Sequence, residues 1–258
     1  MDIIEYQELC IREYKASIGY PESYTYLFGK TIKVQVPIET TINKIMIVGA
    51  YPSAKFFSVK RKDGTYVNDT PLDDNDSPFS DETYMDGPRT RRIPSGKELN
   101  EVILQKIGVE RQDCWITDLV KVFLFKEGHI KKYIKLGKSD ITPNRNLFDT
   151  YADQSLTWLH HEIEICNPYA IILLGVEVSC AVLKLDSISG KNALKGNVIT
   201  RVLRGKERNF ICLPHPGILM RKGQPGNDWP KDFEESISGT VKSEIKRLQS
   251  QNQSIITS

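Results

Sequence analysis

Four short apolar runs, separated by longer segments of helical periodicity, form the main pattern along this chain. Each run is rich in β-branched residues and ends in polar or turn residues, as buried strands do. The four predicted strands are residues 44–49, 114–119, 169–175 and 209–213.

Apolar residues at helical spacing fill the segments between and around these strands. One helix is predicted to begin at Ser95, because Ser95 and Glu98 have the spacing of a capping box ahead of apolar residues. The predicted helices are residues 2–17, 95–107, 151–166, 176–185 and 231–248. This alternation predicts an α/β fold, a three-layer αβα sandwich whose central, mainly parallel sheet of about four strands is covered on both faces.

The chain has 258 residues, 40% of them apolar, which suits one large domain with a sizeable core. We expect a single domain over residues 1–248 and a flexible tail over 249–258, which is rich in Gln and Ser. Residues 57–94 are polar and poorly periodic, and a long segment of this kind is usually functional or disordered. Its aromatic residues Phe79 and Tyr84 favour a lid with some order.

Unusual residues lie at the carboxyl ends of the predicted strands, where open α/β sheets bind their ligands. A turn with glycine follows the first strand, an aspartate lies in the second, a glycine ends the third and a His-Pro turn follows the fourth. These residues are Gly49, Ala50, Tyr51, Pro52, Ser53, Asp118, Gly175, Pro214, His215, Pro216 and Gly217. Their convergence predicts one binding crevice.

The net charge of +2 is small, but the charges are unevenly distributed. Residues 71–86 are acidic, whereas residues 88–97, 191–208 and 221–222 are basic. Basic patches of this kind either bind phosphates or are solvated surface charge. The candidate contacts to a phosphate backbone are Arg89, Arg91, Arg92, Lys206, Pro216, Gly217, Arg221 and Lys222.

The chain has no apolar run of the ~18 residues that a membrane helix needs, and its acidic start lacks the apolar core of a signal peptide. Its five cysteines are scattered and form no C-x-x-C pair: Cys10, Cys114, Cys166, Cys180 and Cys212. Reduced core cysteines favour a cytoplasmic location. We therefore expect no membrane partner, no disulfide and no metal.

The crevice residues resemble the motifs of the uracil-DNA glycosylase superfamily, most closely its family-4-like branch. The resemblance covers residues 44–248 and consists of four motifs in the order and spacing of the family. They are residues 49–53, residues 95–99 with 115–121, residues 168–175, and residues 204–206 with 215–221. The resemblance implies a DNA glycosylase that acts on a base flipped out of DNA. DNA is thus the expected partner, and we expect a monomer.

Three departures from the family pattern change what the resemblance implies. The family usually has an acid in its first motif, at one of the positions held here by Ala50 and Tyr51. The iron–sulfur cysteines of the branch are absent, with Val122 standing where a ligand would be, so we expect no cofactor. Asp118 occupies the place of the asparagine that reads uracil.

These residues suggest how the reaction would proceed. His215 would hydrogen-bond to O2 of the departing base, where negative charge develops. A protonated Asp118 would accept from N4 of cytosine and donate to its N3, and burial in an apolar crevice favours that protonated form. Serine at position 53 leaves room at C5 of the pyrimidine, where some relatives have a bulky tyrosine. The combination predicts excision of a C5-modified cytosine, as in the modified DNA of some bacteriophages.

Several roles stay open at this point. The stacking ring is one of four residues, Tyr51, Phe56, Phe79 and Tyr84. The missing acid is replaced either by substrate-assisted ionisation or by a lid carboxylate, the choices being Asp73, Asp74, Asp76, Asp81, Glu82 and Asp86. The alternatives for the whole protein are a uracil-DNA glycosylase of base-excision repair and a catalytically inactive DNA-binding or sensing module.

Overall fold

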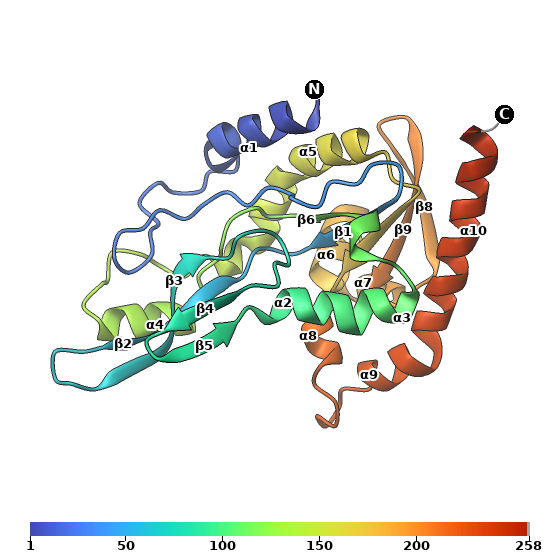
Figure 1. The fold of residues 1–258 in the computed structure, drawn as a ribbon. Helices are drawn as coiled ribbons and strands as arrows, with labels where there is room; N and C mark the ends of the chain where they lie inside the picture. Colours follow the sequence, from blue (N-terminus) through green and yellow to red (C-terminus); the bar gives the residue numbers. More distant parts are fainter. Residues whose placement is uncertain (257–258) are drawn as a thin grey trace.

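A five-stranded sheet runs through the centre of the protein in the computed structural model, which describes residues 1–256 (Figure 1). The strand order is β6-β1-β7-β9-β8. The four parallel strands are β6 (Cys114–Asp118), β1 (Ile45–Gly49), β7 (Ala170–Leu174) and β9 (Lys206–Leu213). The strand β8 (Val198–Leu203) pairs antiparallel with β9 at one edge. The predicted α/β sandwich with a mainly parallel sheet is therefore confirmed, with β8 as an additional strand.

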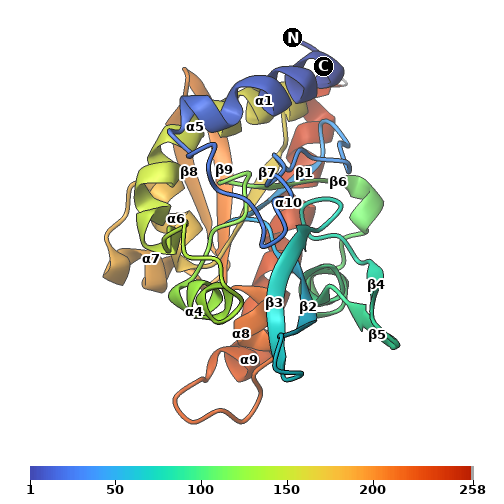
Figure 2. The same cartoon turned by 90° about the vertical axis from the view of Figure 1, so that its left-hand side faces the viewer.

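Alternate residues of the strands point to two apolar cores, one on each face of the sheet. On one face, Met46 and Val48 pack with α1 (Ile3–Ser17), α5 (Phe148–Cys166) and α6 (Val176–Leu183). On the other face, Ile45 and Ile47 pack with the helical segment 94–107 and with α10 (Ser238–Ile256). Figure 2 shows α1 and α5 on one side of the strands and α10 on the other. The fold has the three layers that the sequence predicted.

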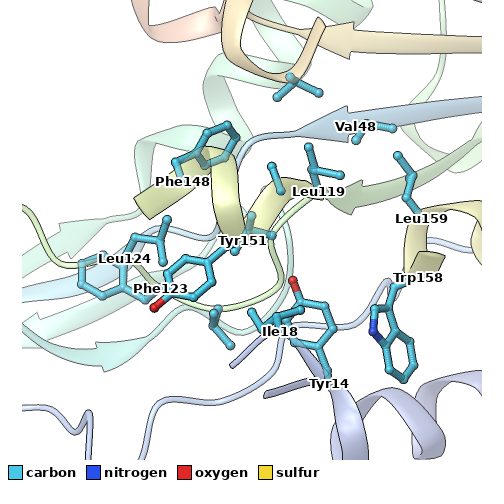
Figure 3. Packing of buried hydrophobic residues seen from close by; sticks show 14 of the residues in the cluster. Tyr14, Ile18, Val48, Leu119, Phe123, Leu124, Phe148, Tyr151, Trp158 and Leu159 are labelled. Atoms are coloured by element: carbon cyan, nitrogen blue, oxygen red, sulfur yellow. The ribbon is translucent and has the colours of Figure 1, made fainter. Parts of the chain in front are cut away.

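Aromatic rings from distant parts of the chain fill the core beneath α1. The ring of Trp158 on α5 contacts the ring of Tyr14 edge-on, with centroids 5.7 Å apart. The Tyr14 hydroxyl also accepts a hydrogen bond from the backbone N–H of Lys121 at 2.8 Å. Figure 3 shows Tyr14, Trp158 and Tyr151 close to Leu119, which follows β6. This packing fixes the backbone just beyond the strand that carries Asp118.

The expected lid is two β-hairpins rather than an irregular loop. The first pairs β2 (Ala54–Lys60) with β3 (Tyr66–Asp74), and the second pairs β4 (Thr83–Asp86) with β5 (Arg89–Arg92). The hairpin β2–β3 projects from the body of the protein at the lower left of Figure 1. Ion pairs link the lid internally, and they include Lys55–Glu82 at 2.7 Å and Arg91–Asp86 at 2.7 Å.

The helices differ from the prediction at two ends. The expected capping box at Ser95 does not form, because the helix α2 (Pro94–Lys97) begins at Pro94. Its N-cap is Ile93, which makes no side-chain capping hydrogen bond. It continues as a π-helix (Glu98–Leu104) and then as α3 (Gln105–Ile107). At the other end of the chain, α10 runs to Ile256, so the predicted tail is helical as far as the described residues go, and residues 257–258 lie outside them.

Further helices were not expected from the sequence. The helix α4 (Glu127–Lys135) follows β6. The other elements are α7 (Ser187–Ala193), α8 (Pro216–Leu219), α9 (Trp229–Asp232), a π-helix (Phe233–Ile237) that leads into α10, and two 3-10 turns (Arg111–Asp113, Arg145–Leu147). Within residues 1–256, no helix has the length and apolar character needed to span a membrane.

Candidate active site

A cavity of about 310 Å³ opens at the carboxyl edge of the parallel strands. The sheet register explains its position, because Gly49 and Asp118 are paired at the ends of β1 and β6, and Leu174 and Leu213 are paired at the ends of β7 and β9. The cavity is lined by Ala50, Tyr51, Pro52, Ser53, Phe56, Phe79, Pro94, Ser95, Glu98, Asp118, Phe123, Lys126, His129, Arg145, Glu177 and His215. The predicted crevice thus brings the turn after β1, Asp118 and His215 together.

The floor of the cavity consists of Asp118 and the ring of Phe79, both packed against Gly49. A Cβ placed on Gly49 would lie 2.2 Å from Oδ1 of Asp118 and 2.4 Å from the Phe79 ring. Phe79 adopts a left-handed backbone conformation (φ 52°), and its carbonyl accepts a hydrogen bond from Arg111 at 3.0 Å. Of the four rings considered for stacking, Tyr51, Phe56 and Phe79 line the cavity, and Phe79 shares its position against Gly49 with Asp118.

Asp118 is almost completely buried, with 2% of its surface exposed. Burial raises the pKa of its carboxyl to about 7, whereas the nearby Lys121 ammonium opposes this rise. The ammonium is itself engaged, because Lys121 forms a buried ion pair with Glu162 at 2.5 Å and donates to the Asp118 carbonyl at 3.1 Å. The carboxyl is therefore protonated over much of the range below neutral pH.

His215 is held as the N-cap of α8. The backbone N–H of Gly217 donates a hydrogen bond to its Nδ1 at 3.1 Å. Burial lowers the pKa of the imidazole, so the ring is neutral near pH 7. Since Nδ1 is an acceptor, the ring proton is on Nε2, which makes His215 a neutral hydrogen-bond donor on the cavity wall.

Tyr51, at one of the two positions where the acid was expected, belongs to a cluster with Arg145 and Glu177. Arg145 donates to the Tyr51 hydroxyl at 3.0 Å and lies over its ring at 4.9 Å. The same guanidinium donates to Glu177 at 2.6 Å. The carboxylate of Glu177 is thus neutralised within the cluster.

A second group of cavity residues is Phe56, Phe123, Lys126 and His129, from β2, the segment after β6 and the start of α4. The rings of Phe56 and Phe123 lie 5.6 and 5.5 Å from the ring of His129, centroid to centroid. Burial lowers the pKa of His129 to about 4, and its Nδ1 accepts the backbone N–H of Lys126 at 3.1 Å. His129 therefore offers a neutral Nε2 donor there, and Lys126 an ammonium group.

Several cavity residues were not expected from the sequence as site residues. Ser95 and Glu98 were assigned to a helix cap, and the residues Phe123, Lys126, His129, Arg145 and Glu177 had no assigned role. These last five residues do not lie in one short motif. They come from the segment between β6 and α4, from α4 itself, from a 3-10 turn and from α6.

Other predicted residues do not line the cavity. Tyr84 hydrogen-bonds to the backbone of Phe56, and its own ring lies outside the cavity wall. Each lid carboxylate considered as a replacement acid is bound elsewhere, in pairs such as Asp76–Lys55 and Asp81–Arg92, and none lines the cavity.

The predicted phosphate contacts are dispersed over the molecule. Arg91 and Arg92 form ion pairs within the lid, and Arg89 lies exposed at its second hairpin. Arg221 and Lys222 are exposed just after α8, with Lys222 paired to Glu234 at 2.7 Å. Lys206 begins β9 and so lies at the opposite end of that strand from the cavity.

The cysteines form no metal site among residues 1–256. All five are free, and no group of three or more His, Cys, Asp or Glu side chains in this part of the chain is arranged to hold a metal ion. The residues present do not fit an iron–sulfur cluster.

Comparison with known proteins gives one clear match. A family model described as the uracil DNA glycosylase superfamily matches residues 40–235. The matched range contains the four parallel strands, the lid and the whole cavity wall. A comparison with curated proteins finds no matching relative.

Proposed function

The chain belongs to the uracil DNA glycosylase superfamily, whose members are DNA glycosylases, and on that premise we propose that it excises a C5-modified cytosine from DNA. The proposal assigns base recognition to Asp118, leaving-group stabilisation to His215 and stacking to Phe79. It further assigns the side of the cavity that Ser53, Phe56 and His129 line to the C5 substituent.

The buried carboxyl of Asp118 is the observation that carries the proposal. A protonated carboxyl both donates and accepts, which matches the acceptor N3 and the donor N4 of cytosine. Uracil has the reverse pattern, with a donor at N3 and an acceptor at O4, so it would pair only if the two oxygens of the Asp118 carboxyl exchanged their donor and acceptor roles. A wrong pairing leaves a buried polar group unsatisfied at a cost of about 1–3 kcal/mol. That cost corresponds to roughly one to two decades in preference.

The neutral His215 suits the departure of the base. The bond between C1′ of the sugar and N1 of the base breaks with its electrons moving to the base, so negative charge develops at O2. A fixed Nε2–H donor stabilises this charge without reorganisation. Asp118 can also supply a proton to N3 of a leaving cytosine.

The size of the cavity supports a substituted base. Ser53 is small, and the same cavity is also lined by Phe56, Lys126 and His129. Aromatic faces with hydrogen-bond donors around them suit a polar, hydroxyl-bearing substituent such as a hexose on hydroxymethylcytosine. The clefts that bind small molecules commonly combine apolar walls with a few polar groups in this way.

Cleavage assays on four matched duplexes test the proposal. The duplexes carry uracil, cytosine, 5-hydroxymethylcytosine or its glucosylated form at one position, and the product is the abasic site. We expect the unmodified protein to cut the substituted cytosines fastest and the Asp118→Asn variant to shift towards uracil.

A second pair of variants examines the position beside C5. Ser53→Tyr should slow cleavage of the substituted cytosines, whereas Ser53→Ala, which keeps the space open, should not. Cutting of uracil alone by the unmodified protein, or an Asp118→Asn variant with unchanged preference, would contradict the proposal.

A further inference from the structure

The cavity contains three carboxylates, and only one of them lacks an assigned role. Asp118 forms the floor, and Glu177 is bound by Arg145. Glu98 also lines the cavity, and its side chain makes no ion pair or hydrogen bond with another residue of the described chain. A half-buried acid without a partner in a binding cavity is available for chemistry.

Glu98 lies close to the His215 turn. Its Oε2 is 3.7 Å from the position that a Cβ on Gly217 would occupy, and Gly217 is the residue that donates to Nδ1 of His215. The hydroxyl Oγ of Ser95, one helical turn earlier and also on the cavity wall, is buried without a hydrogen-bond partner. A water molecule held between Ser95 and Glu98 would satisfy both groups.

We propose that Glu98 is the catalytic residue that activates the water nucleophile, taking the place of the acid missing at Ala50 and Tyr51. In this step the water oxygen bonds to C1′, the C1′–N1 bond breaks with its electron pair on the base, and a water proton passes to the Glu98 carboxylate. The departing base takes one proton from Asp118 or from solvent, and Glu98 and Asp118 regain their starting protonation by exchange with solvent, so water is the only net co-reactant. This role rests on the proposed glycosylase activity and does not depend on which base is cut.

The charges around Glu98 give the reaction a pH dependence. Burial raises the pKa of Glu98, and Arg221, which follows α8, opposes the rise. The other ionisable groups nearby are the neutral His215 on α8 and, on its own helix, Lys97 and Glu101, which pair with each other at 3.7 Å. A general base works when deprotonated, so cleavage should increase as the pH rises through this pKa.

Single-turnover cleavage of the four duplexes by Glu98→Gln, Glu98→Asp and Glu101→Gln tests the inference. Glu101 is a matched control because it lies on the same helix, with 58% of its side chain exposed and outside this cavity. We expect Glu98→Gln to lower the cleavage rate by at least about 100-fold, the range of general-base effects. Glu98→Asp should recover part of the rate, and Glu101→Gln should match the unmodified protein.

Two further measurements separate a chemical role from a structural one. The affinity for DNA and the melting temperature of Glu98→Gln should equal those of the unmodified protein, and the acidic limb of the pH–rate profile should flatten. Equal cleavage rates for Glu98→Gln and an active unmodified protein would overturn this inference and leave the proposed function intact. An unmodified protein that cuts none of the four duplexes would overturn both.

Discussion

The Asp118 carboxyl lies directly against Gly49, so that Oδ1 is 2.2 Å from where a Cβ on that glycine would be. A distance this short means that the glycine is required for the carboxyl to reach the cavity floor. The Phe79 ring meets the same position at 2.4 Å. Asp118 and Phe79, the two side chains that would contact the base, can therefore take these positions only because residue 49 has no Cβ.

Gly49→Ala should accordingly lower cleavage by at least about 100-fold, because displacement of a positioned group by as little as 1 Å has that effect. The measurement is single-turnover cleavage of whichever duplex the unmodified protein cuts. Gly239→Ala is the control, since a Cβ at Gly239 on α10 has nothing within 4 Å. Full activity of Gly49→Ala would show that Asp118 and Phe79 are not fixed as described.

The buried Asp118 should make stability depend on pH. Burial raises its pKa from the ordinary value of 3.8 to about 7, so the folded state holds this proton more tightly than the unfolded state does. The protonated Asp118 makes its full contribution to the free energy of unfolding below the pKa of the unfolded state. This contribution is lost as the pH rises to about 7, at up to about 1.4 kcal/mol per pH unit. Asp118→Asn removes this loss because an amide has no charge to bury.

Chemical unfolding of both proteins at pH 5, 6, 7 and 8 measures the effect. The free energy of unfolding of Asp118→Asn should rise relative to that of the unmodified protein from pH 5 to pH 7 and level off by pH 8. A difference that stays constant from pH 5 to pH 8 would mean that Asp118 ionises at its ordinary pKa.

Two substitutions of His215 separate its capping role from its chemical role. His215→Ala loses both the acceptor for the Gly217 N–H and the Nε2 donor, whereas His215→Asn keeps an acceptor, because asparagine is among the best N-caps. Cleavage should fall by about 10²–10³-fold in both variants. Only the alanine variant should lose about 1 kcal/mol of stability. Near-normal cleavage by His215→Asn would assign the residue to the cap alone.

The contacts with DNA phosphates that the sequence predicts for Arg221 and Lys222 imply a salt effect. Each phosphate contact contributes about 0.9 to the slope of log affinity against log salt. Reversing both charges with Arg221→Glu and Lys222→Glu should therefore flatten the slope by about two, measured by fluorescence anisotropy between 50 and 200 mM salt. Lys246→Glu on α10 is the control, and an identical slope for all proteins would make these cations ordinary surface charge.

The parallel strands and the crevice were predictable because apolar runs such as 45–49 and 170–174 are buried on both faces. The edge strand β8 escaped prediction, since residues such as Arg201 are exposed and its only neighbour is β9. The hairpins β2–β3 and β4–β5 were not predicted from the sequence for a related reason. Ion pairs such as Arg91–Asp86 hold them, and pairs of this kind leave no apolar periodicity in the sequence.

The site was predictable only where motifs carried it. His215 and Asp118 lie in short motifs at strand ends, and the structure places both on the cavity wall. His129 and Arg145 reach the same cavity through tertiary packing, which no local pattern records. Glu98 was assigned to a capping box by its spacing from Ser95, yet Pro94 starts the helix one residue earlier and leaves both side chains on the cavity wall.

The π-helix that begins at Glu98 makes the length of this segment a constraint in its own right. A π-helix pairs residue i with i+5, so it holds more residues per turn than the α-helices on either side. Deleting one residue from 99–103 would let the turn close as an ordinary α-helical turn with its two ends in nearly the same orientation, whereas adding one residue to the flanking α-helical turns would rotate the two ends by about 100° relative to each other. Leu99 and Ile103 would then leave the core, or Glu98 would leave the cavity. Among homologous chains, this stretch should therefore accept substitutions, and the loss of the one extra residue of the π-turn, far more readily than insertions.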